Sequence, residues 1–414
     1  MTIYIPKLNI SIAKIYLEKM GLHSEMRGYF RNTFPDSVLQ HLPSCDVQIV
    51  DFMWLLYRFY TPHSACHPRE FIAFGSSNAE RFFTAGGSVF VFCFDTPGLV
   101  PLAKAEEHLK RAKRKGSELV SSPLTADALP HPWMTALLDR KVRGALIELL
   151  SVGLCEWFEN SPGCRSKTLI IHGPLGTLSR GLDTLELDLR GVGEADLTVS
   201  SFATYYSNRT TVVRVLDSDE LPILLLSMQR KKRVKPLYVW LTNGKKEYEQ
   251  QEVIGEFDLA VENKTIFHLT RMKETCPCAV DLFVFFVIIQ RSDFVRKIIV
   301  GANVSKVMSS LIESGKGREK SLLRLGEDEA FLNADEMEKL FKKVAESTKR
   351  AKLLEDSACK MLRAWWNWLY WGFGGDGPLP TTLSPTRYAW DGEGRRETVE
   401  TCKQMFTFKI DGSL

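Results

Sequence analysis

Short apolar runs rich in β-branched and aromatic residues recur along the first 250 residues and alternate with longer amphipathic stretches. Each run is a few residues long and is bounded by Gly, Pro or Asp, which is typical of a buried strand. The predicted strands lie at 47–51, 86–95, 167–172, 211–217 and 236–242.

The stretches between these runs have helical spacing. Trp54, Tyr57 and Tyr60 are spaced for a helix, LAKAEEHLKRAKRKG at 102–116 predicts a strongly basic helix, and another helix is expected at about 135–158. Residues 117–134 are rich in Ser, Pro and Ala and predict a loop. From Glu194 onward, one helical face collects Val199, Phe202, Ala203 and Tyr206. Strands separated by helices predict an α/β fold, with a mostly parallel central sheet flanked by helices.

Acidic residues follow several of these strands directly. Asp51, Asp95 and Asp217 each come at the end of a buried run, and ligands of parallel sheets bind outside the carboxyl ends of the strands. Two further pairs of the form acid-x-acid stand close together in the chain, Glu194 with Asp196 and Asp217 with Asp219. If the strands are parallel neighbours, these carboxylates converge on one edge of the sheet.

A converging set of carboxylates needs a chemical reason. Any one of them is most simply explained as a helix cap or a turn residue, but a set that arrives in order at strand ends is not. Like charges at one site repel each other and raise each other's pKa unless cations neutralise them. Two Mg²⁺ or Mn²⁺ ions about 4 Å apart, held by oxygen ligands, activate water and stabilise the leaving oxygen of a phosphodiester.

Composition excludes several other classes of protein. The chain has 414 residues, a net charge of +4, 44% hydrophobic residues and 25% charged residues, which is ordinary for a soluble globular protein. Its nine cysteines are odd in number and scattered, which favours reduced thiols. MTIYIPKLNISIAK lacks the apolar core of a secretory signal, and the apolar run at 280–289 is too short to span a bilayer. We therefore expect a soluble intracellular protein with no membrane partner, in the nucleus or at a cytoplasmic viral replication site.

The order of the motifs resembles the flap endonuclease/XPG family of 5′-nucleases, which is built on a PIN-like domain. MGLHSEMRGYF resembles the family's opening segment, VDFMWLLY its first acid with a following aromatic, and VFVFCFD with AKAEEHLKR its next acid and basic helix. GEAD and LDSDELPILL resemble its two acid pairs, and VDLFVFFVIIQRSDFV resembles the segment that supplies the last acid, Asp293. The resemblance covers roughly residues 20–313, and divergent 5′-nucleases of large DNA viruses are similar in the same way.

The resemblance implies roles for individual residues. It implies two Mg²⁺ ions, replaceable by Mn²⁺, with Lys104 and Arg111 of the basic helix as catalytic residues that reach the scissile phosphate. The first metal site would take Asp51, Asp95, Glu194 and Asp196, and the second Asp217, Asp219 and Asp293.

The same resemblance implies a path for nucleic acid. Tyr57 would stack on the terminal nucleotide, and a helical arch at about 102–134 would let a free 5′ end pass. Two basic runs add candidate nucleic-acid contacts, the second of which is equally well explained as a surface loop. The candidates are Lys110, Lys113, Arg114, Arg230, Lys231, Lys232 and Arg233.

Three regions are expected. Residues 1–19 form an extension, unless translation begins at Met20; residues 20–313 form the catalytic domain; and residues 314–414 form a helical, aromatic-rich region. Asn303 stands where the family has the second glycine of a duplex-binding hairpin. Replication proteins are conceivable partners, but no clamp-binding motif is seen, because QMFTF at 404–408 has the wrong spacing.

We therefore expect a metal-dependent, structure-selective 5′-nuclease that cleaves DNA near single-strand/duplex junctions in replication, repair or recombination. Its nucleic-acid partner would be DNA with a free 5′ end or a junction. Two alternatives stay open. VGEAD after DTLELDLR also resembles a segment of 5′-3′ exoribonucleases, which would make RNA the substrate, and a protein with the same fold could be a non-catalytic nucleic-acid-binding replication scaffold.

Overall fold

The structure is a computed structural model, and it describes most of the chain between residues 34 and 275. The described ranges are 34–39, 41–59, 66–84, 86–96, 121–182, 195–215, 220–230, 233–241 and 265–275, with residues 185 and 189 and five short strands further on. These ranges hold the strands of a central sheet and the helices that pack against it.

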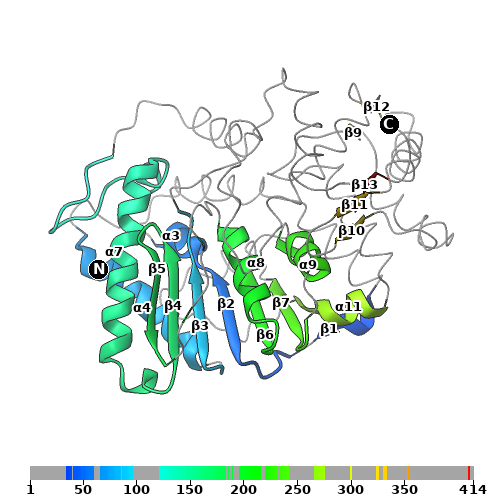
Figure 1. Ribbon diagram of the computed structural model, residues 1–414. Coiled ribbons are helices and arrows are strands. Elements are labelled where there is room, and N and C mark those ends of the chain that lie inside the picture. The colour runs from blue at the N-terminus through cyan, green and yellow to red at the C-terminus, as the bar shows by residue number, and fades with distance from the viewer. Residues whose placement is uncertain are drawn as a thin grey trace, which may run out of the picture.

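A single eight-stranded sheet forms the centre of the described part (Figure 1). Its strand order is β1-β8-β7-β6-β2-β3-β4-β5. The neighbours from β7 through β6, β2 and β3 to β4 are parallel, whereas β1, β8 and β5 pair antiparallel at the two margins. The predicted mostly parallel sheet is therefore confirmed. The strands are β1 (Val38–Leu39), β2 (Val47–Asp51), β3 (Val89–Cys93), β4 (Thr168–Gly173), β5 (Gly176–Gly181), β6 (Thr211–Val215), β7 (Leu237–Leu241) and β8 (Thr265–His268).

Helices cover both faces of this sheet (Figure 1). Side chains alternate along β3, so that Phe90 stacks on Phe83 of α4 at a ring-centroid distance of 3.8 Å, whereas Cys93 faces the opposite side, near α8 and α9. The helices are α3 (Met53–Arg58), α4 (Pro68–Thr84), α6 (Trp133–Ala136), α7 (Arg140–Asn160), α8 (Ala195–Tyr205), α9 (Glu220–Arg230) and α11 (Leu269–Thr275), with 3-10 turns η1 (Pro35–Ser37) and η2 (Pro162–Cys164).

Burial on both faces explains why the central strands could be found by their apolar runs. All five residues of β3, of β6 and of β7 are buried, as expected for parallel strands between two helical layers. The face predicted for the helix after Glu194 is confirmed as well, because Val199, Phe202, Ala203 and Tyr206 are all buried on α8 or just after it.

The helices α4 and α7 pack closely because glycine stands at their contact. A Cβ atom added at Gly153 of α7 would lie 2.5 Å from Cγ2 of Ile72 in α4. Such a distance is far below ordinary van der Waals contact, so a side chain there would require Ile72 or one of the helices to shift. A Cβ atom added at Gly144, earlier in the same helix, would have no described atom within 4 Å.

The described end of the predicted arch is a loop that packs onto the domain. Within residues 121–134, Leu129 donates its backbone N–H to the carbonyl of Cys66 at 2.8 Å, and Trp133 donates its indole N–H to the carbonyl of Leu56 at 2.7 Å. Both of these side chains are buried. The loop predicted at 117–134 is thus confirmed over 121–132, after which α6 begins, while 102–120, including the predicted basic helix, lies outside the described residues.

The carboxy-terminal region is described only as short strands. They are β9 (Ile299–Val300), which pairs with β12 (Lys352–Leu353), and β10 (Leu323–Leu325), β11 (Ala330–Leu332) and β13 (Lys409–Ile410), which form a second small sheet. The sequence predicts a helical region here, but β10, β11 and β12 are paired strands instead. The expected boundaries at residues 19 and 313 lie outside the described residues. Among the helices described, none is long and apolar enough to cross a membrane.

Candidate functional site

The strand order brings two of the predicted acids to one edge of the sheet. Strand β2 lies between β6 and β3, and all three are parallel. Asp51 is the last residue of β2 and is paired in register with Cys93, the last residue of β3, and Asp95 follows two residues later. Asp217, two residues beyond β6, lies outside the described residues. The expected convergence is confirmed for Asp51 and Asp95, whereas their role as metal ligands remains a prediction.

Asp95 joins the end of β3 to the start of α8. Its Oδ1 atom accepts a hydrogen bond from the backbone N–H of Ala195 at 3.2 Å, although the two residues are a hundred positions apart. Because Ala195 is the first residue of α8, this bond satisfies one of the free N–H groups at the helix start. It also brings the next residue, Asp196, beside the edge formed by β2 and β3. Glu194 lies outside the described residues.

Asp51 has a similar local bond. Its Oδ1 atom accepts the backbone N–H of Met53 at 3.0 Å, at the start of α3. The sulfur of Met53 in turn accepts the backbone N–H of Asp95 at 3.3 Å, which ties the two strand ends together. One oxygen of each carboxylate therefore has a structural task in the fold.

The thiol of Cys93 shows where the negative charges gather. Burial raises the pKa of this thiol well above its usual value, and the charges of Asp51, Glu220 and Asp196 raise it further. These three carboxylates come from β2, α9 and α8, so the field at Cys93 is produced by three separate elements. Glu220 is fully buried at the first position of α9. Sequence reasoning missed it, although its place directly after Asp219 in the run DSDE could have suggested it.

The described carboxylates fit a divalent cation in chemistry but do not complete a site. Carboxylate oxygens are the ligands that Mg²⁺ and Mn²⁺ prefer. Within the described ranges, however, no group of three or more His, Cys, Asp or Glu side chains is arranged to hold a metal ion. The other expected ligands, Glu194, Asp217, Asp219 and Asp293, all lie outside those ranges.

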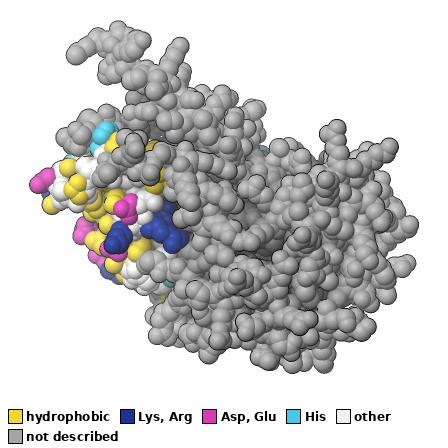
Figure 2. Space-filling view, turned by 90° about the horizontal axis from the view of Figure 1, so that it is seen from above, with side chains coloured by type: hydrophobic (Ala, Val, Ile, Leu, Met, Phe, Trp, Pro, Cys, Tyr) yellow, Lys and Arg dark blue, Asp and Glu magenta, His cyan; other side chains and the backbone are white. Residues whose placement is uncertain are grey.

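Basic residues lie at the same end of the sheet. Helix α7 runs antiparallel to β4, so its first turn is at the carboxyl end of the strands, with Asp139 as the N-cap and Arg140 and Lys141 exposed. Figure 2, which looks onto this end, shows Lys and Arg side chains beside acidic ones on the described surface. The Nη2 atom of Arg143 lies 4.0 Å from Oδ2 of Asp95, which makes Arg143 a second residue that sequence reasoning missed.

The residue predicted to stack on a nucleotide is partly exposed. Tyr57 is 38% exposed on α3, whereas its neighbours Trp54 and Leu56 are buried. Because α3 directly follows Asp51, this ring belongs to the same end of the sheet. Its contact with nucleic acid remains a prediction.

Arg233, in contrast, is engaged inside the protein. Its guanidinium donates to the carbonyls of Ala203, Tyr206 and Arg209, the last at 2.9 Å, and to Oγ1 of Thr211 at 2.8 Å. Burial lowers its pKa to about 10, so it stays charged at neutral pH. These bonds join the end of α8 to β6. Arg233 therefore has a structural role that its place in a basic run of the sequence does not indicate.

The remaining predicted contacts are not placed. Arg230 is the last residue of α9. The other candidates lie outside the described residues, and they are Lys104, Arg111, Lys110, Lys113, Arg114, Lys231 and Lys232.

A buried histidine lies near the carboxyl end of β4, the strand beside β3. His172 is paired in register with Cys93, is 3% exposed, and its Nδ1 atom lies 2.8 Å from Oγ1 of Thr177 in β5. Burial lowers its pKa from 6.5 to about 4. At neutral pH this imidazole is therefore uncharged and adds no positive charge to the edge.

Comparison with known proteins gives distant likenesses only. The chain matches no protein-family model and no curated protein. It is similar to a structure of the catalytic core of Rad2 in complex with DNA substrate, at 12% identity over 90% of this chain and 98% of that one, with a TM-score of 0.39. A second Rad2 complex gives 13% identity, 78% and 75% coverage and a TM-score of 0.35. The T5 D15 protein co-crystallised with metal ions gives 12% identity, 87% and 97% coverage and a TM-score of 0.30. At TM-scores below 0.5 these likenesses assign neither fold nor function.

Proposed function

We propose that this protein is a metal-dependent nuclease that hydrolyses phosphodiester bonds of DNA near a free 5′ end or a junction. The observation that carries the proposal is the bond from Ala195 to Asp95. It joins α8 to the edge where β2 and β3 end, so that Asp51, Asp95 and Asp196 come from three separate elements to one end of the sheet. The resemblance of the motif order to 5′-nucleases agrees with this arrangement.

The proposed division of roles follows the chemistry of each side chain. Two Mg²⁺ ions, when bound, supply an activated water and charge for the leaving oxygen. Asp51, Asp95, Glu194 and Asp196 would hold one ion, and the second set consists of Asp217, Asp219 and Asp293. Lys104 and Arg111 would face the scissile phosphate and stabilise its developing charge, and Tyr57 would stack on the terminal base.

One observation favours the alternative of a non-catalytic nucleic-acid-binding protein. Asp51 and Asp95 each accept a backbone N–H bond, so each has a structural reason to be acidic or amidic. A cap uses a single oxygen, however, and Asn serves there as well as Asp. A cap does not require the negative charge, so replacing Asp by Asn tests whether the charge is needed.

The test is a cleavage assay of variants that remove one negative charge each, while the backbone bonds of Asp51 and Asp95 can be kept. The parent and the variants Asp51→Asn, Asp95→Asn and Asp196→Asn are incubated with Mg²⁺ and 5′-labelled flap, gapped, single-stranded and RNA substrates. Glu156→Gln, on an exposed position of α7, is the control. We expect cleavage of DNA by the parent and the control and loss of at least about a hundredfold in each Asn variant. Full activity in the Asn variants would mean that Asp51 and Asp95 serve only as hydrogen-bond acceptors. Cleavage of RNA alone, with mononucleotides released from the 5′ end, would favour the exoribonuclease alternative.

A further inference from the structure

Both carboxylate oxygens of Asp95 have a partner within the protein. Oδ1 accepts the N–H of Ala195 at 3.2 Å, and Oδ2 faces the guanidinium of Arg143 at 4.0 Å. The Asp95 side chain is 24% exposed and that of Arg143 is 15% exposed, so the ion pair is only partly screened by water. A positive charge is thus already in place beside one candidate ligand oxygen.

The contact from Arg143 is weak enough to be replaced. Its distance of 4.0 Å is the outer limit of an ion pair, and the second bond of the guanidinium, from Nη1 to the carbonyl of Leu137, is long at 3.4 Å. Arg143 also stands in the first turn of α7, four residues after the N-cap Asp139, where the helix dipole disfavours a cation.

From this geometry we propose that Arg143 and a divalent cation compete for Asp95. The inference rests on the proposed function, because it takes Asp95 as a metal ligand. While no cation is bound, Arg143 stays beside Oδ2 of Asp95 and supplies its counter-charge. When a cation binds, the guanidinium gives up Oδ2, so Arg143 sets the metal concentration at which the site fills.

The competition has a direction that a purely structural role does not share. A fixed positive charge a few ångströms from a ligand oxygen repels an incoming dication, so its removal should tighten metal binding by about three- to tenfold. If Arg143 instead only held Asp95 in place, its removal would loosen the ligand and weaken metal binding. The two roles therefore predict opposite changes.

The experiment is a Mn²⁺ titration of the full-length chain, followed by electron paramagnetic resonance of the free ion and by thermal melts. The parent is compared with Arg143→Gln, with Arg143→Lys, which keeps the charge, and with Arg140→Gln, which removes an exposed charge from the same helical turn. We expect Arg143→Gln to half-saturate at about three- to tenfold lower Mn²⁺, and the other two variants to stay within about twofold of the parent. Added salt should shrink the difference.

The failures are distinguishable. If the parent responds to Mn²⁺ but Arg143→Gln binds it with equal or lower affinity, the competition is refuted and the proposed function stands. If the parent itself shows no saturable response, the metal-dependent function fails and the competition fails with it. Circular dichroism without metal shows whether Arg143→Gln is folded; if it is not, Arg143→Lys decides, since weaker Mn²⁺ binding by that variant would mark a holding role.

Discussion

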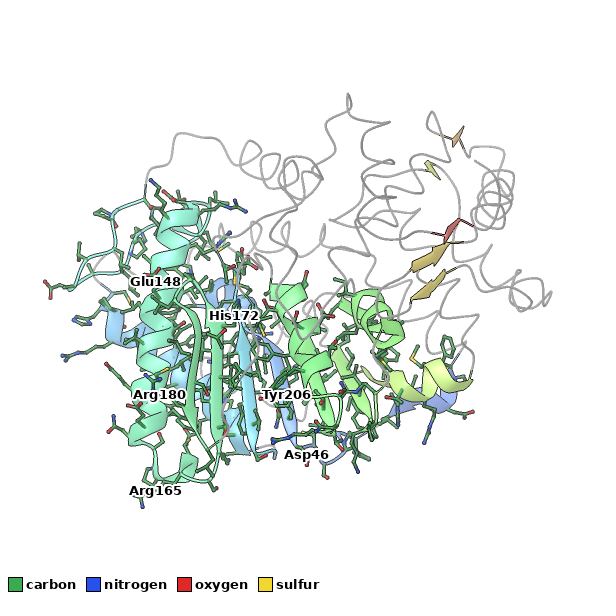
Figure 3. The ribbon with its side chains drawn as sticks, viewed as in Figure 1. Asp46, Glu148, Arg165, His172, Arg180 and Tyr206 are labelled. Atoms are coloured by element: carbon green, nitrogen blue, oxygen red, sulfur yellow. The ribbon has the colours of Figure 1, made fainter. Side chains whose placement is uncertain are left out.

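The two ends of the parallel sheet use acidic residues in opposite ways. At the amino end, just before β2, the exposed Asp46 accepts the N–H of Thr210 on its Oδ2 at 2.8 Å, and its carbonyl accepts the N–H groups of Ser88 and Val89. At the carboxyl end, the charges of Asp51, Asp196 and Glu220 act together on one buried thiol. Figure 3 shows Asp46 and His172 at these opposite ends.

The comparison distinguishes an acid that stabilises the fold through hydrogen bonds from acids whose like charges repel one another. Asp46 directly precedes β2 and accepts N–H groups at the starts of β3 and β6, so it connects three neighbouring strands. The acids at the carboxyl end come from separate elements. The positively charged guanidinium of Arg143 lies beside one of them, with Nη2 4.0 Å from Oδ2 of Asp95. Acids that gather at one place from separate elements are a feature of many functional sites.

The largest expected effect is the difference in cleavage rate between removing an acid's charge at the carboxyl end and removing one at the amino end. Asp95→Asn should lower cleavage of a flap substrate by about a thousandfold, because a ligand charge of the proposed metal site is lost while the bond to Ala195 can be kept. Asp46→Asn should leave the rate unchanged, since it is far from that site. Single-turnover rates at saturating Mg²⁺ measure both. Equal losses in the two variants would erase the distinction between the ends.

The next effect concerns pH at the carboxyl end. His172 has a folded-state pKa of about 4 against a usual value of 6.5. As pH falls from 6.5 towards 4, the unfolded chain takes up a proton that the folded protein does not, so the free energy of unfolding falls by up to about 3 kcal/mol. This contribution to stability is fully present above pH 6.5.

Urea unfolding of the parent and of His172→Gln between pH 4 and 7 checks this expectation. The free energy of unfolding should fall less steeply with acid in the variant, because one proton-binding group has gone. Carboxylates contribute the same background to both proteins. If the two pH dependences coincide, the imidazole is not held neutral in the folded protein.

A smaller effect is expected at the amino end. Asp46→Ala removes the acceptor of the Thr210 N–H and should lower the free energy of unfolding by about 1 kcal/mol, since a typical intramolecular hydrogen bond contributes about that much. Metal should not alter the loss. Chemical denaturation with and without Mg²⁺ measures it, and a loss that appears only with metal would connect Asp46 to the other end.

The smallest effect is the one with the opposite sign. Asp51→Asn can keep the bond to the N–H of Met53 while it removes a charge that acts alongside Asp196 and Glu220. The metal-free variant should therefore be as stable as the parent or more stable by about 0.5 kcal/mol, because a like-charge repulsion is relieved. Thermal melts without metal decide, and a clear loss of stability would place Asp51 with Asp46 as a fastening acid.

The sequence by itself determined the elements that burial marks on two sides. The strands β2, β3, β4, β6 and β7 and the apolar face of α8 were predicted because parallel strands between helical layers are continuously apolar and helices repeat every 3.6 residues. The acids at strand ends could be located in the same way. Strand β5, in contrast, is polar and only partly buried, so its sequence carries no such signal.

Only the tertiary structure decided which of these elements are neighbours. The order β6-β2-β3, the bond from Ala195 to Asp95 and the approach of Arg143 each join residues far apart in the chain. Arg233, one member of a basic run, turned out to bind backbone carbonyls. Local periodicity reports which side of an element is buried. It does not report which element lies against it, because that depends on packing summed over the whole domain.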